Sequence, residues 1–133
     1  MPTISIVAAL IRDEAGRVLL VRKRGTRAFM QPGGKRDPGE DDATALAREL
    51  NEELGCRVVS GSCKPLGEFV APSANEPGFE VRASVYAVSV EGVIAPRAEI
   101  EEMMWIDPAR TGGLTLAPLT RDHVLPLALL QVN

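Results

Sequence analysis

The feature that most constrains this chain is residues 33–56, GGKRDPGEDDATALARELNEELGC. On an α-helix over residues 41–54, Glu49, Glu52 and Glu53 stand at positions i, i+3 and i+4, so their carboxylates share one face. A separate apolar stripe lies beside this face: Ala43, Leu46, Ala47, Leu50 and Leu54. The pattern predicts a helix whose apolar stripe packs against a sheet. The acids then lie along the edge of this contact.

The flanking residues support the ends of this helix. Asp41 is suited to the N-cap, and Asp42 in the first turn interacts favourably with the helix dipole. Gly55 is suited to the position just after the last turn. Arg48 and Glu52 form an i, i+4 pair of opposite charge. These signals together predict one well-defined helix after a Gly- and Pro-rich loop.

The acidic face itself has two interpretations. Like charges at i, i+4 destabilise an isolated helix by a few tenths of a kcal/mol per pair. Pairs of opposite charge stabilise it by about the same amount. A chain stacks acids in this way on a solvated face or around a cation. Mg²⁺ takes oxygen ligands and binds through a few carboxylates together with substrate phosphates.

The spacing of the fixed residues resembles the Nudix box of the Nudix hydrolases. The matching order is Gly34, five residues, Glu40, seven residues, Arg48-Glu49-Leu50, one residue, Glu52-Glu53, one residue, Gly55 and Cys56. Cys56 departs from the bulkier aliphatic residue that is usual there, although cysteine also behaves as a small hydrophobe. The resemblance implies an α/β fold, the Nudix-type α/β/α sandwich with a mixed β-sheet.

The resemblance also implies a metal site on this helix. Glu49, Glu52 and Glu53 are similar to the family's metal ligands, and the backbone carbonyl of Gly33 is similar to a further ligand. Glu49 or Glu53 would also orient or deprotonate the attacking water. The implied cofactor is Mg²⁺, with Mn²⁺ as the alternative.

Other box residues are similar to supporting groups. Arg48, which we also count among the catalytic residues, and Glu40 resemble the pair that braces helix and loop. Gly34 and Gly55 would allow sharp turns and a close backbone approach.

Many family members use a further acid outside the box. We place it first at Glu99, then at Glu102 and then at Glu101, with a solvated surface acid as the alternative for each.

Substrate contacts are less constrained by the sequence. Arg22 and Arg24, in the basic end of a predicted strand, are candidates for phosphate contacts, with an exposed strand end as the alternative. Phe29 is a candidate for stacking on a base, and core packing is the alternative. Pro72, sixteen residues after the box, hints at members that act on ADP-ribose.

The remaining pattern predicts a single domain over residues 1–133. We expect strands at residues 3–11, 17–24, 57–59, 66–70, 79–90 and 103–106, and a second helix over residues 119–130 that Pro126 bends or shortens. The first two strands are expected to form a hairpin around the turn at residues 13–16.

Composition narrows the partners. A net charge of −3 argues against a nucleic-acid polymer. The opening residues lack a basic leader and a membrane span, and Cys56 and Cys63 have no zinc or redox spacing. We therefore expect a cytoplasmic protein without a membrane partner, and leave its oligomeric state open.

The expected function is Mg²⁺-dependent hydrolysis of a pyrophosphate bond in a nucleoside di- or triphosphate derivative, by attack of water on phosphorus. The alternatives are hydrolysis of ADP-ribose or nucleotide sugars, a non-catalytic nucleotide-sensing Nudix domain, and a structural cation-binding module. The intact acids argue against a sensor, and the absence of EF-hand spacing argues against the structural module.

Overall fold

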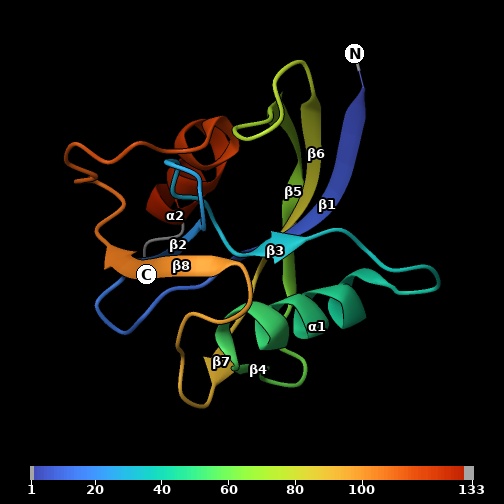
Figure 1. Cartoon of the computed structure of the whole chain (residues 1–133). Coiled ribbons are helices and arrows are strands. Elements are labelled where there is room, and N and C mark those ends of the chain that lie inside the picture. Colours follow the sequence, from blue (N-terminus) through green and yellow to red (C-terminus); the bar gives the residue numbers. More distant parts are fainter. Residues whose placement is uncertain (1, 131–133) are drawn as a thin grey trace.

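The computed structural model describes residues 2–130, so residues 1 and 131–133 of the expected domain lie outside the described part. The elements, shown in Figure 1, are β1 (Thr3–Leu10), β2 (Val18–Lys23), β3 (Gly33–Gly34), α1 (Asp42–Leu54), β4 (Arg57–Val58), β5 (Lys64–Pro72), β6 (Glu80–Ala87), β7 (Val90–Glu91), β8 (Ile100–Ile106), the π-helical turn η1 (Thr120–Val124) and α2 (Leu125–Leu130). No helix within residues 2–130 is long and apolar enough to cross a membrane.

Strands of both directions form the central sheet. Its order is β3-β1-β6-β5, in which β1 and β6 run parallel and the other neighbours run antiparallel. Two antiparallel ribbons, β2-β8 and β4-β7, complete the strand layer. The expected mixed sheet is therefore confirmed.

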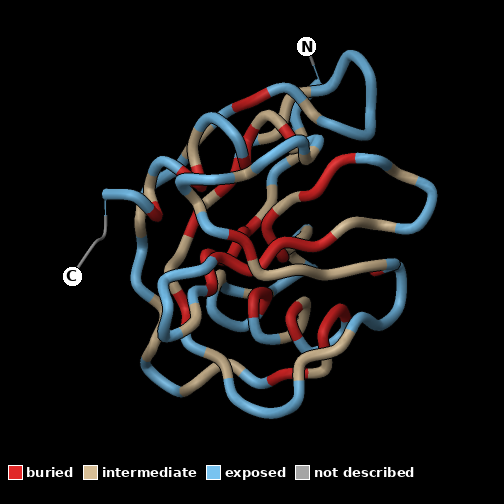
Figure 2. The backbone as a smooth tube through the Cα atoms, turned by 90° about the vertical axis from the view of Figure 1, so that its left-hand side faces the viewer, coloured by how far each residue is buried: buried red, intermediate tan, exposed pale blue. Residues whose placement is uncertain are grey.

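Two hydrophobic cores lie on opposite faces of the strands. Alternate side chains of β1 serve both, because successive strand residues point to opposite faces: Val7 and Ala9 join the core under α1, whereas Ala8 and Leu10 join the core under α2. Figure 1 shows α1 and α2 on different sides of the strands, and Figure 2 shows buried backbone running through the central strands. This is the expected α/β/α sandwich.

The expected hairpin of residues 3–11 and 17–24 forms only beside its turn, where the Asp13 N–H donates to the Arg17 carbonyl at 2.9 Å and the Leu19 N–H donates to the Ile11 carbonyl at 3.0 Å. The expected pairing along the two strands is wrong. The turn exists, with the Gly16 N–H donating to the Asp13 carbonyl at 3.0 Å. Beyond an isolated bridge between Arg12 and Val18, however, β1 pairs with β3 and β6, whereas β2 pairs with β8. Both strands are apolar on both faces, so their residue pattern identifies buried strands without identifying their neighbours.

Smaller differences concern where elements end. The strand expected at residues 79–90 divides into β6 and β7, β5 is longer than expected at both ends, and β8 begins at Ile100. The second helix begins with the wide turn η1, just before Pro126, a residue that lacks an N–H donor.

The ends of α1 follow from its capping residues. The Asp41 carboxylate accepts from the Thr44 N–H at 2.9 Å. Gly55 ends the helix in the left-handed conformation, with φ 70°, and its N–H donates to the Asn51 carbonyl. Both residues have the capping roles expected from the sequence.

Asp42 connects the start of α1 to the sheet. Its carboxylate accepts from Arg36 Nε at 2.6 Å and from the Tyr86 hydroxyl. Arg36 also donates to the hydroxyls of Ser5 at 3.1 Å and Ser84 at 3.2 Å, on β1 and β6. The hydrogen bond to Asp42 raises the pKa of Tyr86 to about 12. These contacts fix where the helix begins relative to the strands.

We expect Tyr86→Phe to lower the free energy of unfolding by about 1 kcal/mol, because it removes a charge-assisted hydrogen bond and keeps the ring in the core. Urea denaturation of both proteins measures the change. An unchanged midpoint and slope would show that the hydroxyl does not stabilise the start of α1.

Candidate active site

A cavity of about 400 Å³ opens beside the junction of β3 and α1. One end is charged and is lined by Glu49, Glu53 and Glu99 together with Lys23 and Lys35. The other end is lined mainly by aliphatic side chains of the sheet and of the segment before η1, and by the loop between β5 and β6. The cavity thus combines a polar region with an apolar one.

Glu53 is the most buried of the acids, with 8% of its surface exposed. It stands next to Leu54, which packs under the sheet, so the docking of α1 carries its carboxyl inward. The Gly33 N–H donates to Glu53 Oε1 at 3.3 Å. Burial, and then the neighbouring charge of Glu49, raise the pKa of Glu53 to about 7.

Glu49 lies against the backbone of the Gly-Gly pair. Its side chain is 16% exposed, and burial raises its pKa despite the nearby positive charge of Arg48. A Cβ atom on Gly34 would lie 2.1 Å from Glu49 Oε2. Only glycine at position 34 leaves room for the carboxylate in this position.

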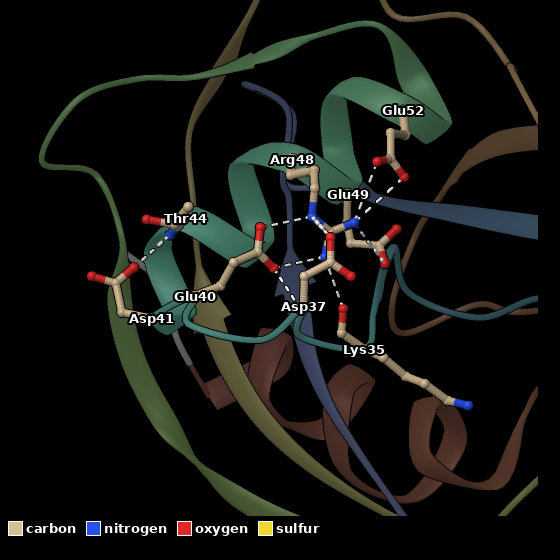
Figure 3. A network of polar contacts seen from close by, with 8 residues as sticks. All are labelled: Lys35, Asp37, Glu40, Asp41, Thr44, Arg48, Glu49 and Glu52. Carbon is tan, nitrogen blue, oxygen red and sulfur yellow. Dashed lines mark hydrogen bonds and ion pairs between the residues drawn. The ribbon is translucent and has the colours of Figure 1, made fainter.

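Arg48 is the centre of the polar network in Figure 3. Nε and Nη2 donate to the two oxygens of Glu40 at 2.7 and 2.8 Å, and Nη2 also donates to the Lys35 carbonyl at 2.9 Å. Hydrogen bonds from Arg48, and then from the Asp37 N–H, lower the pKa of Glu40 to about 2. The network joins the loop before α1 to the middle of the helix.

Glu52 lies apart from the other two box acids. Its side chain is 54% exposed and is not among the cavity-lining residues, and Arg48 Nη1 donates to it at 3.3 Å. Within the described part of the chain, no three acidic, histidine or cysteine side chains form a ready-made metal cluster.

The three acids outside the box differ in whether they reach the cavity. Glu101 pairs with Arg24 at 3.3 Å, and Glu102 pairs with Arg22 at 3.0 Å. Glu99, just before β8, lines the cavity, and its charge adds to the raised pKa of Glu53. Glu99 is therefore the outer acid that the fold brings to the box.

The structure does not bring the three expected substrate contacts to the cavity. Arg22 and Arg24 are held by acids of β8, whereas Lys23 between them lines the cavity. Alternation along a strand puts neighbouring side chains on opposite faces and could have identified Lys23 in advance. Phe29 is buried in the core on the α2 side, the alternative role considered for it.

The groups at the charged end fit a hard divalent cation. They are carboxylate oxygens and the backbone of Gly33, the ligand type that Mg²⁺ and Mn²⁺ prefer. Burying two neighbouring carboxylates is unfavourable, and the pKa of both Glu49 and Glu53 is raised even though Arg48 and Lys23 carry positive charge nearby. A bound cation would offset that cost.

Comparison with known proteins agrees with this fold. The model of the NUDIX domain matches residues 2–128, and the chain belongs to this family. The chain is 35% identical over 74 residues to the 8-oxo-dGTP diphosphatase of Haemophilus influenzae, a match that covers 53% of this chain and 54% of that protein. The chain thus spans about half the length of that relative.

Two further matches cover more of the chain. The CTP pyrophosphohydrolase of Escherichia coli is 30% identical over 125 residues, covering 89% of this chain and 86% of that protein. The crystal structure of the MutT NUDIX hydrolase from Burkholderia pseudomallei superposes with a TM-score of 0.76 over all of both chains, at 24% identity. The latter similarity supports the fold.

We expect Glu53→Gln to stabilise the metal-free protein in a pH-dependent manner. The folded-state pKa of Glu53, about 7, lies above the ordinary value of 4.5. Between these values the folded chain keeps a proton that the unfolded chain has lost, so the contribution of Glu53 to stability falls as pH rises. The variant should exceed the wild-type Tm by about 10 °C at pH 8 and match it near pH 4.5.

Thermal unfolding in a chelator across this pH range measures the difference. Glu101→Gln, which changes an exposed acid on β8, is the matched control and should show no such trend. A Tm difference between Glu53→Gln and the wild type that stays constant with pH would contradict the raised pKa of Glu53.

Proposed function

We propose that the protein hydrolyses a pyrophosphate bond in a nucleoside di- or triphosphate derivative, by attack of water on phosphorus, with Mg²⁺ as cofactor and Mn²⁺ as the alternative. The observation that carries this proposal is the pair of desolvated carboxylates, Glu49 and Glu53, in a cavity that also holds two lysines. The activities in the names of the Haemophilus and Escherichia relatives support a nucleotide substrate.

We assign the metal ligands to the charged end of the cavity. Glu49, Glu53, Glu99 and the Gly33 carbonyl would draw closer together to hold the cation, which would supply positive charge against the phosphates and favour a hydroxide-like nucleophile. Glu52 belongs to the same helix face, and its contacts with Arg48, at 3.3 and 3.5 Å, are long enough for the carboxylate to be redirected.

Other groups of the chain would bind the phosphates, activate the water and position the acids. Lys23 and Lys35 line the cavity and would bind phosphate oxygens by charge. Glu53 is our choice for the general base, because it is the most buried acid of the cavity and the Gly33 N–H holds one of its oxygens. Glu49 is the alternative base. Arg48 positions the acids through the helix and loop.

A second candidate function is hydrolysis of ADP-ribose or a nucleotide sugar. Pro72 and the following loop also line the cavity, and a second sugar would contact them. A screen of the purified protein against nucleoside triphosphates, nucleotide sugars, ADP-ribose and dinucleoside polyphosphates, with Mg²⁺ or EDTA, distinguishes these. Binding without turnover in every case would favour a non-catalytic sensor.

The proposal also covers the domain organisation, the location and the partners of the protein. We propose a single domain that acts on a small nucleotide in the cytoplasm, without a nucleic-acid polymer or a membrane as partner. The two free cysteines, Cys56 and Cys63, fit a reducing compartment.

We expect turnover to require a divalent cation and to vanish in EDTA while the fold persists. Glu49→Gln and Glu53→Gln should each lower kcat by about 100-fold or more, equivalent to about 2.7 kcal/mol of barrier. Glu52→Gln should also lower kcat if its carboxylate turns toward the cation. Steady-state kinetics at saturating Mg²⁺ measure these losses, and circular dichroism checks the fold.

Two acids of the same segment provide the matched comparison. Glu99→Gln should lower kcat, whereas Glu101→Gln should leave kcat within about twofold, because Glu101 pairs with Arg24 outside the cavity. Unchanged kcat in Glu49→Gln and Glu53→Gln would remove the acids from the site, and full turnover in EDTA would contradict the metal requirement.

Arg48→Ala should lower kcat by about 10-fold or more and leave KM nearly unchanged. The reason is that Arg48 contacts Glu40, Glu49 and Glu52 and is absent from the cavity lining. Kinetics at several substrate concentrations separate the two constants. A higher KM with wild-type kcat would make Arg48 a substrate-binding residue instead.

A further inference from the structure

A buried polar pair stands outside the acidic site. Of the polar and charged residues described, three are buried: Glu53, Gln31 and Thr120, the last two with 6% and 0% of their surfaces exposed. The Thr120 hydroxyl donates to Gln31 Oε1 at 2.6 Å, connecting the segment before β3 with η1. In this arrangement the contact uses the amide oxygen, which leaves the amide nitrogen for another partner.

Among the described residues, the amide nitrogen of Gln31 is left without a protein partner. Gln31 is one of the residues that line the cavity. No fully buried side-chain nitrogen or oxygen in the described chain is left without a partner, so this nitrogen keeps some accessible surface. It carries two N–H donors, which a ligand acceptor can satisfy.

The cavity that Gln31 lines also has apolar walls. Ile4 and Ile6 of β1, Val81 of β6 and Leu119 belong to its lining. Apolar walls with one directed polar group fit a flat heterocycle, since such pockets take their specificity from a few placed hydrogen bonds. The lysines and acids at the charged end fit the phosphates of the same ligand.

We propose that Gln31, oriented by Thr120, selects the nucleobase by donating its amide N–H to a carbonyl oxygen of the base. This rests on the proposed nucleotide hydrolysis and extends it to the substrate class: bases with a carbonyl at this position are favoured over adenine. Hypoxanthine and adenine differ at C6, where one has a carbonyl acceptor and the other an amino donor. An amino group would face the Gln31 donors and leave both sides unsatisfied.

The test compares ITP with ATP, and IMP with AMP. With Mg²⁺, the wild-type protein should have a kcat/KM for ITP at least about 10-fold above that for ATP, the size expected for one unsatisfied polar contact. Calorimetric titration with IMP and AMP in metal-free buffer should show the same preference. The binding measurement is independent of turnover and of the metal.

Three variants test whether the preference for ITP and IMP depends on Gln31 and Thr120. Gln31→Met keeps the length of the side chain and removes the donor. The ratio of kcat/KM for ITP to kcat/KM for ATP should therefore fall to about one. Gln31→Glu replaces the amide nitrogen with an acceptor and should shift the ratio further toward adenine. Thr120→Val keeps the shape and frees the amide to turn, which should also reduce the ratio, whereas Thr115→Val, the same change at an exposed position, should leave it unchanged.

The outcomes for the two proposals are separable. Equal binding of IMP and AMP by the wild type, or an unchanged preference in folded Gln31→Met and Thr120→Val, would overturn the role of Gln31 even if the protein hydrolyses nucleotides. A preference for IMP that depends on Gln31 would support it even if turnover is absent, and only the missing turnover would then count against the hydrolase.

Discussion

The docking of α1 on the strands is the interaction on which the candidate site depends. Leu46, Leu50 and Leu54 are fully buried beneath the sheet, and this packing carries Glu53 into a place where its charge is poorly solvated. The burial of several leucines stabilises the fold by roughly 1.5–3 kcal/mol for each side chain. This gain is large enough to hold two desolvated acids in place before any cation binds.

The Gly-Gly pair brings the backbone to the acids. Gly33 has φ 145°, and a Cβ atom there would lie 2.2 Å from the Val7 carbonyl, so another residue would disturb the pairing of β3 with β1. Gly34 leaves room for Glu49 in the same way. The arrangement of the charged end therefore rests on close backbone approach, on the packing of one helix, and on the Arg48 network that joins them.

Local signals in the sequence predicted the parts that depend on local chemistry. The helix ends follow from Asp41 and Gly55, and the acidic face follows from the helical repeat of Glu49 and Glu53. The neighbours of β1 and β2 could not be predicted in this way, because strands that are apolar on both faces can pair with several partners. The position of each strand in the sheets depends on contacts between distant segments.

The substrate side of the cavity was predicted least well for the same reason. Arg22 and Arg24 are attractive phosphate ligands by charge, yet their acidic partners come from β8, almost eighty residues further on. Gln31 has no motif of its own, and its relation to Thr120 exists only after η1 packs beside it. Charge alone identified candidates, and the tertiary structure decided which of them reach the cavity.

The most direct test of the central claim is to map bound Mn²⁺ by paramagnetic broadening of the amide signals in an NMR spectrum of the isotope-labelled protein. We expect low concentrations of Mn²⁺ to broaden first the signals of Gly33, Gly34 and Glu53, around the cavity, and excess Mg²⁺ to reverse the effect. Broadening centred on Glu101 and Glu102, or no localised broadening, would contradict the assignment of the metal to the buried acids.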